Sequence, residues 1–297
     1  MTANDVHYNK PAARFKLTRV GVSGVRKPIR VRRPGKEVVL TATIDLFVDL
    51  PATQKGSHMS RNVEVLEEAI DSASARDIGS LEEYAAGLAK SLLKRHEYAT
   101  FSEAHIGADY FLDKAAPSGR KTTEVYRLTA TARGRREGGR LVVKKTVGVE
   151  VTGMTTCPCA MEGVRELMRK RAPRAAKAMA DVPMVTHNQR NVTTVRMEVP
   201  EGSDVEADDL IEMAEGALSS PTREILKRGD EAALVHAAHE NPKFVEDVVR
   251  GILERIVERY KNLPDDAEVV VRSVSQESIH KHDAVAERAT TLGELRK

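Results

Sequence analysis

Alternating apolar and polar residues mark most of the strands that the sequence predicts. The clearest case is residues 38–50, VVLTATIDLFVDL, in which apolar side chains alternate with polar or small ones until Pro51 ends the run. Two further alternating segments flank Glu137-Gly138-Gly139 and predict a long hairpin. The expected strands are 15–22, 38–50, 99–110, 122–135, 140–151, 191–199 and 268–274.

Apolar residues at helical spacing lie between these strands. Ser80 followed by Glu83 is a capping-box pattern, which predicts that a helix begins there. Asn241 and Pro242 predict another helix start, with Asn241 as the N-cap and Pro242 in the first turn. Residues 172–181, rich in Ala, Lys and Arg, indicate no clear element. The expected helices are 61 onward, 80–95, 158–170, 207–218 and 242–261.

The order of these elements is roughly the same in both halves of the chain, although the residues themselves show no repeat. A duplicated antiparallel α+β unit is the simplest architecture with this order. The 297 residues suit one large domain or two modest ones. We therefore expect one compact chain with an N-terminal half at 1–136 and a C-terminal half at 137–297.

Composition and charge narrow the possible functions. Formal net charge is +3, with a pI near 8.8, below that of most dedicated nucleic-acid-binding domains. Such a balance suits a small anionic substrate if basic residues are concentrated locally. No apolar run approaches the ~18 residues that span a bilayer, and the N-terminal residues lack the apolar region of a secretion signal. The only cysteines are Cys157 and Cys159, so we expect a reducing, cytoplasmic setting.

Cys157 lies in the segment TTCPC, which leads directly into a predicted helix. Proline is favoured in the first helical turn, which places Cys157 at the helix N-terminus. The helix dipole and free amides there favour a thiolate, which suits a metal ligand or a nucleophile. A small buried cysteine is the simpler alternative. The C-x-C spacing is shorter than that of a zinc knuckle, so we do not expect both sulfurs on one ion.

Histidines near predicted strand ends are further candidate ligands. His187 begins the polar run HNQR at a loop-to-strand junction, where a solvated histidine is also common. His280 and His282 follow the last strand and would share a face if the strand continued. His236 and His239, three positions apart on a possible helix, are rival ligands.

Charged residues at helix starts and turns form the remaining candidates. Lys55, His58 and Arg61 in the segment KGSHMSR lie beside a helix start and could hold an anion. Glu231 belongs to the charged turn LKRGDE. Glu246 lies near the start of a predicted helix, where a carboxylate is favoured in any case.

Taken together and in order, seven segments resemble the type IB GTP cyclohydrolases, and the long spacer between Cys157 and His187 is similar to the archaeal branch. The resemblance covers nearly the whole chain. It implies a tunnelling fold of two tandem units, each with a four-stranded antiparallel sheet and two helices, which form barrels by oligomerisation. The segments are FKLTRVGVSGVRKP, FVDLPATQKGSHMSRNVE, TTCPCAMEG, THNQR, LKRGDE, NPKFVEDVVR and ESIHKHDA.

The resemblance also implies a site. The family's metal ligands correspond to Cys157, His187, Glu231 and His280, with Cys157 counted as catalytic. Glu246 corresponds to the acid that pairs with the guanine edge. This chain has RGDE where many relatives have RPDE, which keeps the acid and changes only the local turn. One thiolate, two imidazoles and a carboxylate accept Fe(II), Mn(II) or Zn(II), and the archaeal branch is associated with Fe(II).

The implied reaction begins with attack of a metal-activated water on C8 of GTP, and ring opening then releases formate. The archaeal product is 7,8-dihydroneopterin 2′,3′-cyclic phosphate, formed with loss of diphosphate as the first step of tetrahydromethanopterin or folate synthesis. Lys55, His58 and Arg61 are the candidates for binding the triphosphate. A homodimer or homotetramer is expected, because tunnelling-fold sites usually lie between subunits.

Three alternatives remain open from the sequence. The same ring opening could end in dihydroneopterin triphosphate, as in bacterial relatives. A pterin-related reductase would use Cys157 as a covalent nucleophile and consume NADPH without a metal. A basic RNA-binding protein would use the Arg-rich segments 26–33 and 133–140, although these lack interleaved aromatic residues.

Overall fold

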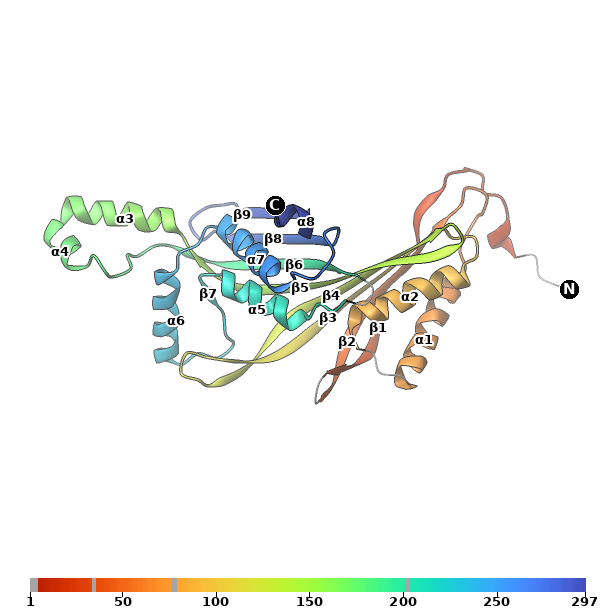
Figure 1. Cartoon of the computed structure of the whole chain (residues 1–297), viewed down its shortest axis with the longest axis horizontal. Helices are drawn as coiled ribbons and strands as arrows, with labels where there is room; N and C mark the ends of the chain where they lie inside the picture. The colour runs from red at the N-terminus through yellow and green to blue at the C-terminus, as the bar shows by residue number, and fades with distance from the viewer. Residues whose placement is uncertain (1–4, 34–35, 76–78, 201–202) are drawn as a thin grey trace. The chain divides into compact units, whose positions relative to one another are not determined.

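Runs of strands are followed by runs of helices along most of the chain, in an α+β arrangement (Figure 1). The computed structural model describes residues 5–33, 36–75, 79–200 and 203–297. The strands are β1 Leu17–Arg33, β2 Lys36–Leu50, β3 Phe101–Ala115, β4 Lys121–Glu137, β5 Arg140–Thr156, β6 Asn188–Val199, β7 Ser220–Pro221, β8 Glu268–Gln276 and β9 Ala284–Thr291. The helices are η1 (3-10) Val6–Tyr8, α1 Met59–Ala75, α2 Leu81–Arg95, α3 Pro158–Arg171, α4 Pro173–Ala178, α5 Ala207–Ala217, α6 Arg228–Glu240, α7 Val245–Arg259 and α8 Leu292–Leu295. None of the described helices is long and apolar enough to cross a membrane.

The described strands belong to one nine-stranded antiparallel sheet in the order β1-β2-β3-β4-β5-β6-β8-β9, with β7 paired to β5. The expectation of two tandem four-stranded sheets is therefore wrong, whereas the α+β class is correct. Strand length is the physical reason. β3, β4 and β5 contain 15, 17 and 17 residues, about three times the common length, so they do not divide into two sets of short strands.

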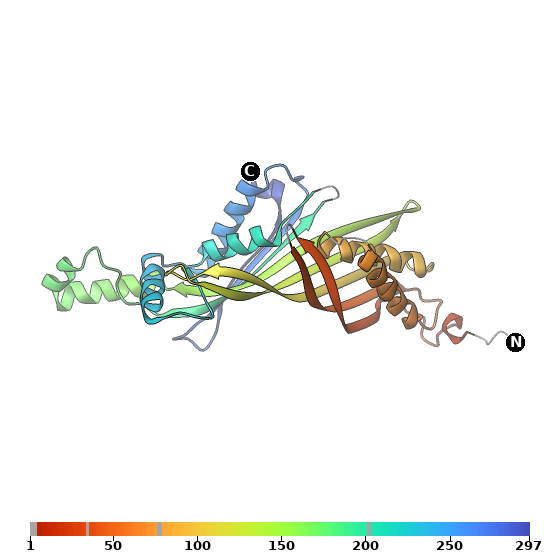
Figure 2. The ribbon, with the colours of Figure 1, turned by 90° about the horizontal axis from the view of Figure 1, so that it is seen from below.

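The first of two compact units contains the described residues up to Tyr110, together with Leu128–Val147 and Glu198–Asp204. Within it, β1 pairs with β2, and α1 and α2 lie side by side against these strands (Figure 2). β1 continues past the predicted end at residue 22, because Gly24, with φ of 73°, lies within a register shift that lets the ladder resume at Val25. The fully buried side chains of this core include Ile44, Leu46, Leu66, Leu88 and Leu92.

The second unit contains Phe111–Arg127, Gly148–Met197 and the described residues from Val205 to Lys297. β6, β8 and β9 pair in succession, and α5 and α7 lie side by side, with α7 packed on β8 and β9. α3 and α4 extend away from the strands of this unit (Figure 1). Its fully buried side chains include Met197, Leu210, Ile211, Leu218 and Ile252.

Several predicted element ends are confirmed. Ser80 caps α2, because its Oγ accepts a hydrogen bond from the Glu83 amide at 3.3 Å. The turn between β4 and β5 has positive φ at both Gly138 (54°) and Gly139 (80°). Two-residue hairpin turns of this kind match the right-handed twist of the strands that they join.

Other ends differ from the sequence expectation. Asn241 closes α6 and does not begin α7, and its Nδ2 donates to the Leu218 carbonyl at 3.1 Å. α7 begins at Val245, where the Asp247 carboxylate accepts from the Phe244 amide at 3.0 Å. α4 lies in the Ala-, Lys- and Arg-rich stretch that predicted no element, and β9 lies where no strand was expected.

Candidate functional site

Cys157 is the N-cap of α3, as the sequence predicts, with Pro158 in the first turn. Its Sγ accepts from the Ala160 amide at 3.4 Å, so the sulfur faces the free amides at the helix start. The Cys157 amide donates to the His187 carbonyl at 3.1 Å, and the Thr186 hydroxyl donates to the Cys157 carbonyl at 2.7 Å. These contacts hold Cys157 and His187 next to each other, although 30 positions separate them.

His187 has one ring nitrogen engaged by polar neighbours. Its Nδ1 lies 3.0 Å from Gln189 Oε1 and 3.6 Å from Glu277 Oε2, while Gln189 Nε2 donates to Glu277 Oε1 at 3.3 Å. Since the Gln189 amide nitrogen is a donor to the carboxylate, its oxygen is the acceptor, and His187 Nδ1 carries the hydrogen. The neutral ring then presents a lone pair at Nε2. Metal-binding histidines are commonly oriented in this way, with the other nitrogen donating to an amide or carboxylate.

His280 lies in the loop between β8 and β9, beyond the strand that was expected to carry it. Its ring is 6.4 Å from that of His187, measured between centroids, and nearly perpendicular to it. His282 stacks on His280 at 5.2 Å, so the two histidines meet through loop geometry and not through a shared strand face. Cys157, His187 and His280 therefore gather in one region of unit 2.

Glu231 lies in the first turn of α6, and its side chain is exposed. Its neighbour Asp230 is buried and accepts from the Ser118 amide at 2.7 Å. Hydrogen bonding to Ser118 lowers the pKa of Asp230 below its ordinary value, so Asp230 anchors the turn as a carboxylate. Within the described residues, the four predicted ligands do not form a group of three whose donor atoms lie within 4.8 Å of one another.

The remaining predicted residues of unit 2 are also on the surface. Glu246 is exposed in the first turn of α7. The rival ligands His236 and His239 are engaged within their own helix: His236 pairs with Glu240 at 3.3 Å, and His239 Nδ1 lies 2.8 Å from the Val235 carbonyl oxygen.

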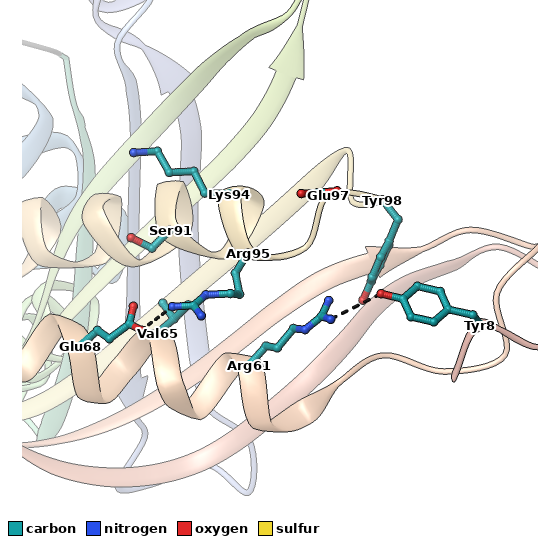
Figure 3. Close-up of a pocket in the computed structure, with 9 residues that line it drawn as sticks. All are labelled: Tyr8, Arg61, Val65, Glu68, Ser91, Lys94, Arg95, Glu97 and Tyr98. Carbon is teal, nitrogen blue, oxygen red and sulfur yellow. Dashed lines mark hydrogen bonds and ion pairs between the residues drawn. The ribbon is translucent and has the colours of Figure 1, made fainter. Parts of the chain in front are cut away.

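In unit 1, Arg61 lines a pocket of about 720 Å³ between α1, α2 and η1 (Figure 3). The Arg61 guanidinium donates to the Tyr8 hydroxyl at 3.4 Å, and the Tyr98 side chain points toward the same place. Arg95 pairs with Glu68, so part of the positive charge of the pocket is balanced. The lining residues are Tyr8, Arg61, Val65, Glu68, Ser91, Lys94, Arg95, Glu97 and Tyr98.

The turn that carries Lys55 and His58, just before α1, is anchored by a hydrogen-bond chain that the sequence did not indicate. Ser57 Oγ is 2.6 Å from the Tyr98 hydroxyl, which is 3.1 Å from His96 Nδ1. His96 is fully buried, and burial, reinforced by electrostatic repulsion from neighbouring groups, chiefly Arg61, lowers its pKa to about 4. His96 is therefore neutral near pH 7. Lys55 is exposed and does not line the pocket.

Unit 1 contains a second cluster of side chains that the sequence did not predict. Asp5, His7 and His58 each offer one donor atom, and these atoms lie within 4.8 Å of one another, which makes them a possible metal site among the described residues. A hydrogen bond from His7 lowers the pKa of the exposed Asp5 carboxyl. Only an Asp-x-His pattern marks this cluster in the sequence, and such a pattern is too short to point to His58.

Comparison with known proteins places the chain in a family. The family model described as "Type I GTP cyclohydrolase folE2" matches residues 3–286. The chain is 44% identical to a GTP cyclohydrolase MptA of Methanosphaera stadtmanae over 99% of this chain and 96% of that protein. It is 40% identical to the GTP cyclohydrolase MptA of Methanocaldococcus jannaschii, again over 99% and 96%.

Among solved structures, the fold is similar to that of uricase from Arthrobacter globiformis, with a TM-score of 0.54 and 10% identity over 93% of both chains. At this identity the likeness concerns the fold alone. The family model and the full-length relatives agree with the resemblance carried by the seven motifs. They show that the chain belongs to the type I GTP cyclohydrolase family described as folE2, and that it is a GTP cyclohydrolase.

Proposed function

We propose that this enzyme converts GTP to formate, diphosphate and 7,8-dihydroneopterin 2′,3′-cyclic phosphate, as the first step of a pterin pathway. The observation that carries the proposal is the full-length similarity, above 40% identity, to proteins named GTP cyclohydrolase MptA. The gathering of Cys157, His187 and His280 from three separate elements supports a reaction centre in unit 2.

We assign the metal of the reaction to Cys157, His187, Glu231 and His280. The chemistry of the donors fits a divalent transition metal, because a thiolate, two imidazoles and a carboxylate suit Fe(II), Mn(II) or Zn(II). His187 supports the assignment most directly, since hydrogen bonding at Nδ1 leaves Nε2 free for a ligand. Fe(II) is our choice for the resident ion. When bound, such an ion supplies Lewis acidity that lowers the pKa of a water molecule towards ~7.

The carboxylate of Glu246 is our candidate for recognising guanine. Its two oxygens can accept hydrogen bonds from N1–H and the 2-amino group, and adenine offers no such pair of donors. The carboxylate is exposed at the start of α7, so it can be reached by a ligand. Lys55, His58 and Arg61 are our candidates for binding the triphosphate, and the direct hydrogen bond from Arg61 to Tyr8 leaves further guanidinium donors for phosphate oxygens.

We further propose that the enzyme is a homodimer or homotetramer. In the single chain, Glu231, Glu246 and His280 are all exposed. Catalysis by ring opening benefits from exclusion of bulk water, and a partner subunit would cover these side chains. Light scattering on the purified enzyme tests this assignment, and a monomer at the concentrations used for catalysis would contradict it.

The deciding experiment is anaerobic incubation of the enzyme with GTP and Fe(II), with formate, diphosphate and the pterin measured together. We expect equal amounts of formate and diphosphate and a pterin with the mass of the cyclic phosphate. Formate without diphosphate, accompanied by dihydroneopterin triphosphate, would replace our product with the bacterial one. Absence of formate under all metal conditions would contradict the proposed reaction.

A further inference from the structure

The cluster of Asp5, His7 and His58 has a geometry suited to a metal ion. Asp5 Oδ1 lies 2.8 Å from His7 Nδ1, and Asp5 Oδ2 lies 3.0 Å from His58 Nε2. The two imidazole rings are 4.2 Å apart between centroids, with their planes inclined by 38°. A carboxylate therefore stands between two ring nitrogens, at a place where all three donors can reach one cation.

Backbone contacts hold the short N-terminal segment against the turn that carries His58. The His7 carbonyl accepts from the amides of Lys55 and Gly56, both at 3.1 Å. Asp5 caps η1 by accepting from the His7 amide at 3.1 Å. Gly56 permits the close approach, since a Cβ there would lie 3.1 Å from His7 Cδ2. The cluster is thus brought together by main-chain hydrogen bonds between segments about 50 positions apart, and does not depend on side-chain contacts alone.

One atom of the cluster lacks a hydrogen bond. His58 Nε2 is buried and forms no hydrogen bond with the described residues, although it lies 3.0 Å from Asp5 Oδ2, an ion-pair distance if the ring is protonated. A buried polar nitrogen without a partner costs roughly 1–3 kcal/mol, which makes such atoms uncommon. A cation bound by the Nε2 lone pair would remove this cost. The imidazole of His58 is also in contact with Tyr8, which limits its access to water.

We propose that Asp5, His7 and His58 form a second divalent-metal site, separate from the one assigned to Cys157, His187, Glu231 and His280. Two imidazoles and one carboxylate are the ligand set of many transition-metal sites with open coordination positions, and imidazole favours Fe(II), Co(II), Ni(II) or Zn(II) over Mg(II). The site contains no sulfur, whereas the Cys157 site contains a thiolate. Co(II) bound at the two sites would therefore have different absorption spectra.

Titration of the metal-stripped, full-length enzyme with Co(II) tests the proposal. We expect two Co(II) per chain in the unaltered protein. His7→Ala should retain one, together with the thiolate-to-cobalt charge-transfer absorption. Cys157→Ala should also retain one, without that absorption. His236→Ala is the matched control, because His236 is exposed and pairs only within its own helix, and it should still bind two.

Asp5→Asn provides a second variant with little change in shape, and circular dichroism reports whether each variant remains folded. We expect its affinity for the second Co(II) to fall about 10-fold or more. If the unaltered enzyme binds one Co(II) per chain and His7→Ala binds none, the result would support this site and contradict the Cys157 assignment. Folded His7→Ala and Asp5→Asn proteins that bind as much Co(II) as the unaltered enzyme, with equal affinity, would overturn the proposal.

Discussion

His96 Nε2 lies 2.7 Å from Asn62 Oδ1, and this contact sets the direction of a buried hydrogen-bond chain in unit 1. Asn62 Nδ2 donates to the Leu46 carbonyl at 3.2 Å, so Oδ1 is an acceptor and His96 Nε2 carries the hydrogen. His96 Nδ1 must then accept from the Tyr98 hydroxyl, which in turn accepts from Ser57. The neutral tautomer of His96 satisfies every member of the chain, and protonation at Nδ1 would break it.

We therefore expect the free energy of unfolding to fall as the pH drops from about 6.5 to about 4. The pKa of His96 is lowered to about 4 by burial, and then by Arg61 and His58, whereas an unfolded histidine titrates near ~6.5. Between these values the unfolded chain binds the extra proton and the folded chain does not, so stability decreases with falling pH. The loss levels off below the folded pKa and amounts to roughly 3 kcal/mol.

Urea unfolding at a series of pH values between 7 and 4 measures this loss. The control is His96→Gln, which should be less stable at pH 7 but should lose less stability on acidification. An identical pH dependence in the two proteins would mean that other groups cause the acid sensitivity.

Cys157→Ala should reduce GTP turnover by more than about 100-fold, because even partners that only orient metal ligands cost 10- to 100-fold when they are lost. Cys159→Ala should keep much of the activity, since Cys159 is exposed as the second residue of α3 and is not one of the proposed ligands. Steady-state assays of formate release with matched metal loading make the comparison. Equal losses in the two variants would contradict the ligand assignment.

Removal of the metal should abolish activity reversibly. Anaerobic dialysis against a chelator should stop formate release, and Fe(II) should restore more activity than Mn(II) or Zn(II) at equal occupancy. The proposed mixed donor set would accept all three ions, so occupancy must be measured together with rate. Full activity in demonstrably metal-free enzyme would rule out the proposed role of the ion.

Glu246→Gln should weaken GTP binding and leave metal content unchanged. A hydrogen bond to a charged group contributes about 1.5–3 kcal/mol, so we expect the dissociation constant to rise roughly 10- to 100-fold. Glu240→Gln is a suitable control, because Glu240 is also exposed but pairs with His236 at the end of α6. Calorimetry with a non-hydrolysable GTP analogue gives both affinities. Unchanged affinity in Glu246→Gln would exclude it as the guanine anchor.

Features decided by nearby residues could be predicted from the sequence. The Ser80 cap, the Cys157 N-cap and the Gly138-Gly139 turn each depend on groups no more than a few positions apart. The start of α7 shows the limit of such rules. Asn241 fits an N-cap by type, yet its side chain bonds to the Leu218 carbonyl, a tertiary contact that no local pattern encodes.

Long-range pairing explains the rest. β9 has little alternation of its own and is a strand because β8 supplies its hydrogen-bonding partner. The single sheet depends on three strands of unusual length, β3, β4 and β5, each of which the pattern located but ended too early. In the site, the motifs pointed to His187 but not to Gln189 and Glu277 as the groups that fix its tautomer. Asp5 and His7 were missed because the His58 turn meets them only in the folded chain.

Gly21→Ala should destabilise unit 1 strongly. Gly21 lies opposite Phe47 in the β1–β2 ladder, and a Cβ at this position would be 1.9 Å from the Leu46 carbonyl oxygen. That atom belongs to a paired backbone, so relief requires one strand to move. We expect the free energy of unfolding to fall by about 3 kcal/mol or more, at the upper end of overpacking penalties.

Gly87→Ala is the matched control, because a Cβ at this exposed position in α2 meets nothing within 4 Å. Its free energy of unfolding should rise by about 0.5–1 kcal/mol from reduced backbone entropy. Urea midpoints of both variants check this, and an unchanged midpoint in Gly21→Ala would show that the β1–β2 ladder is not as closely packed as described.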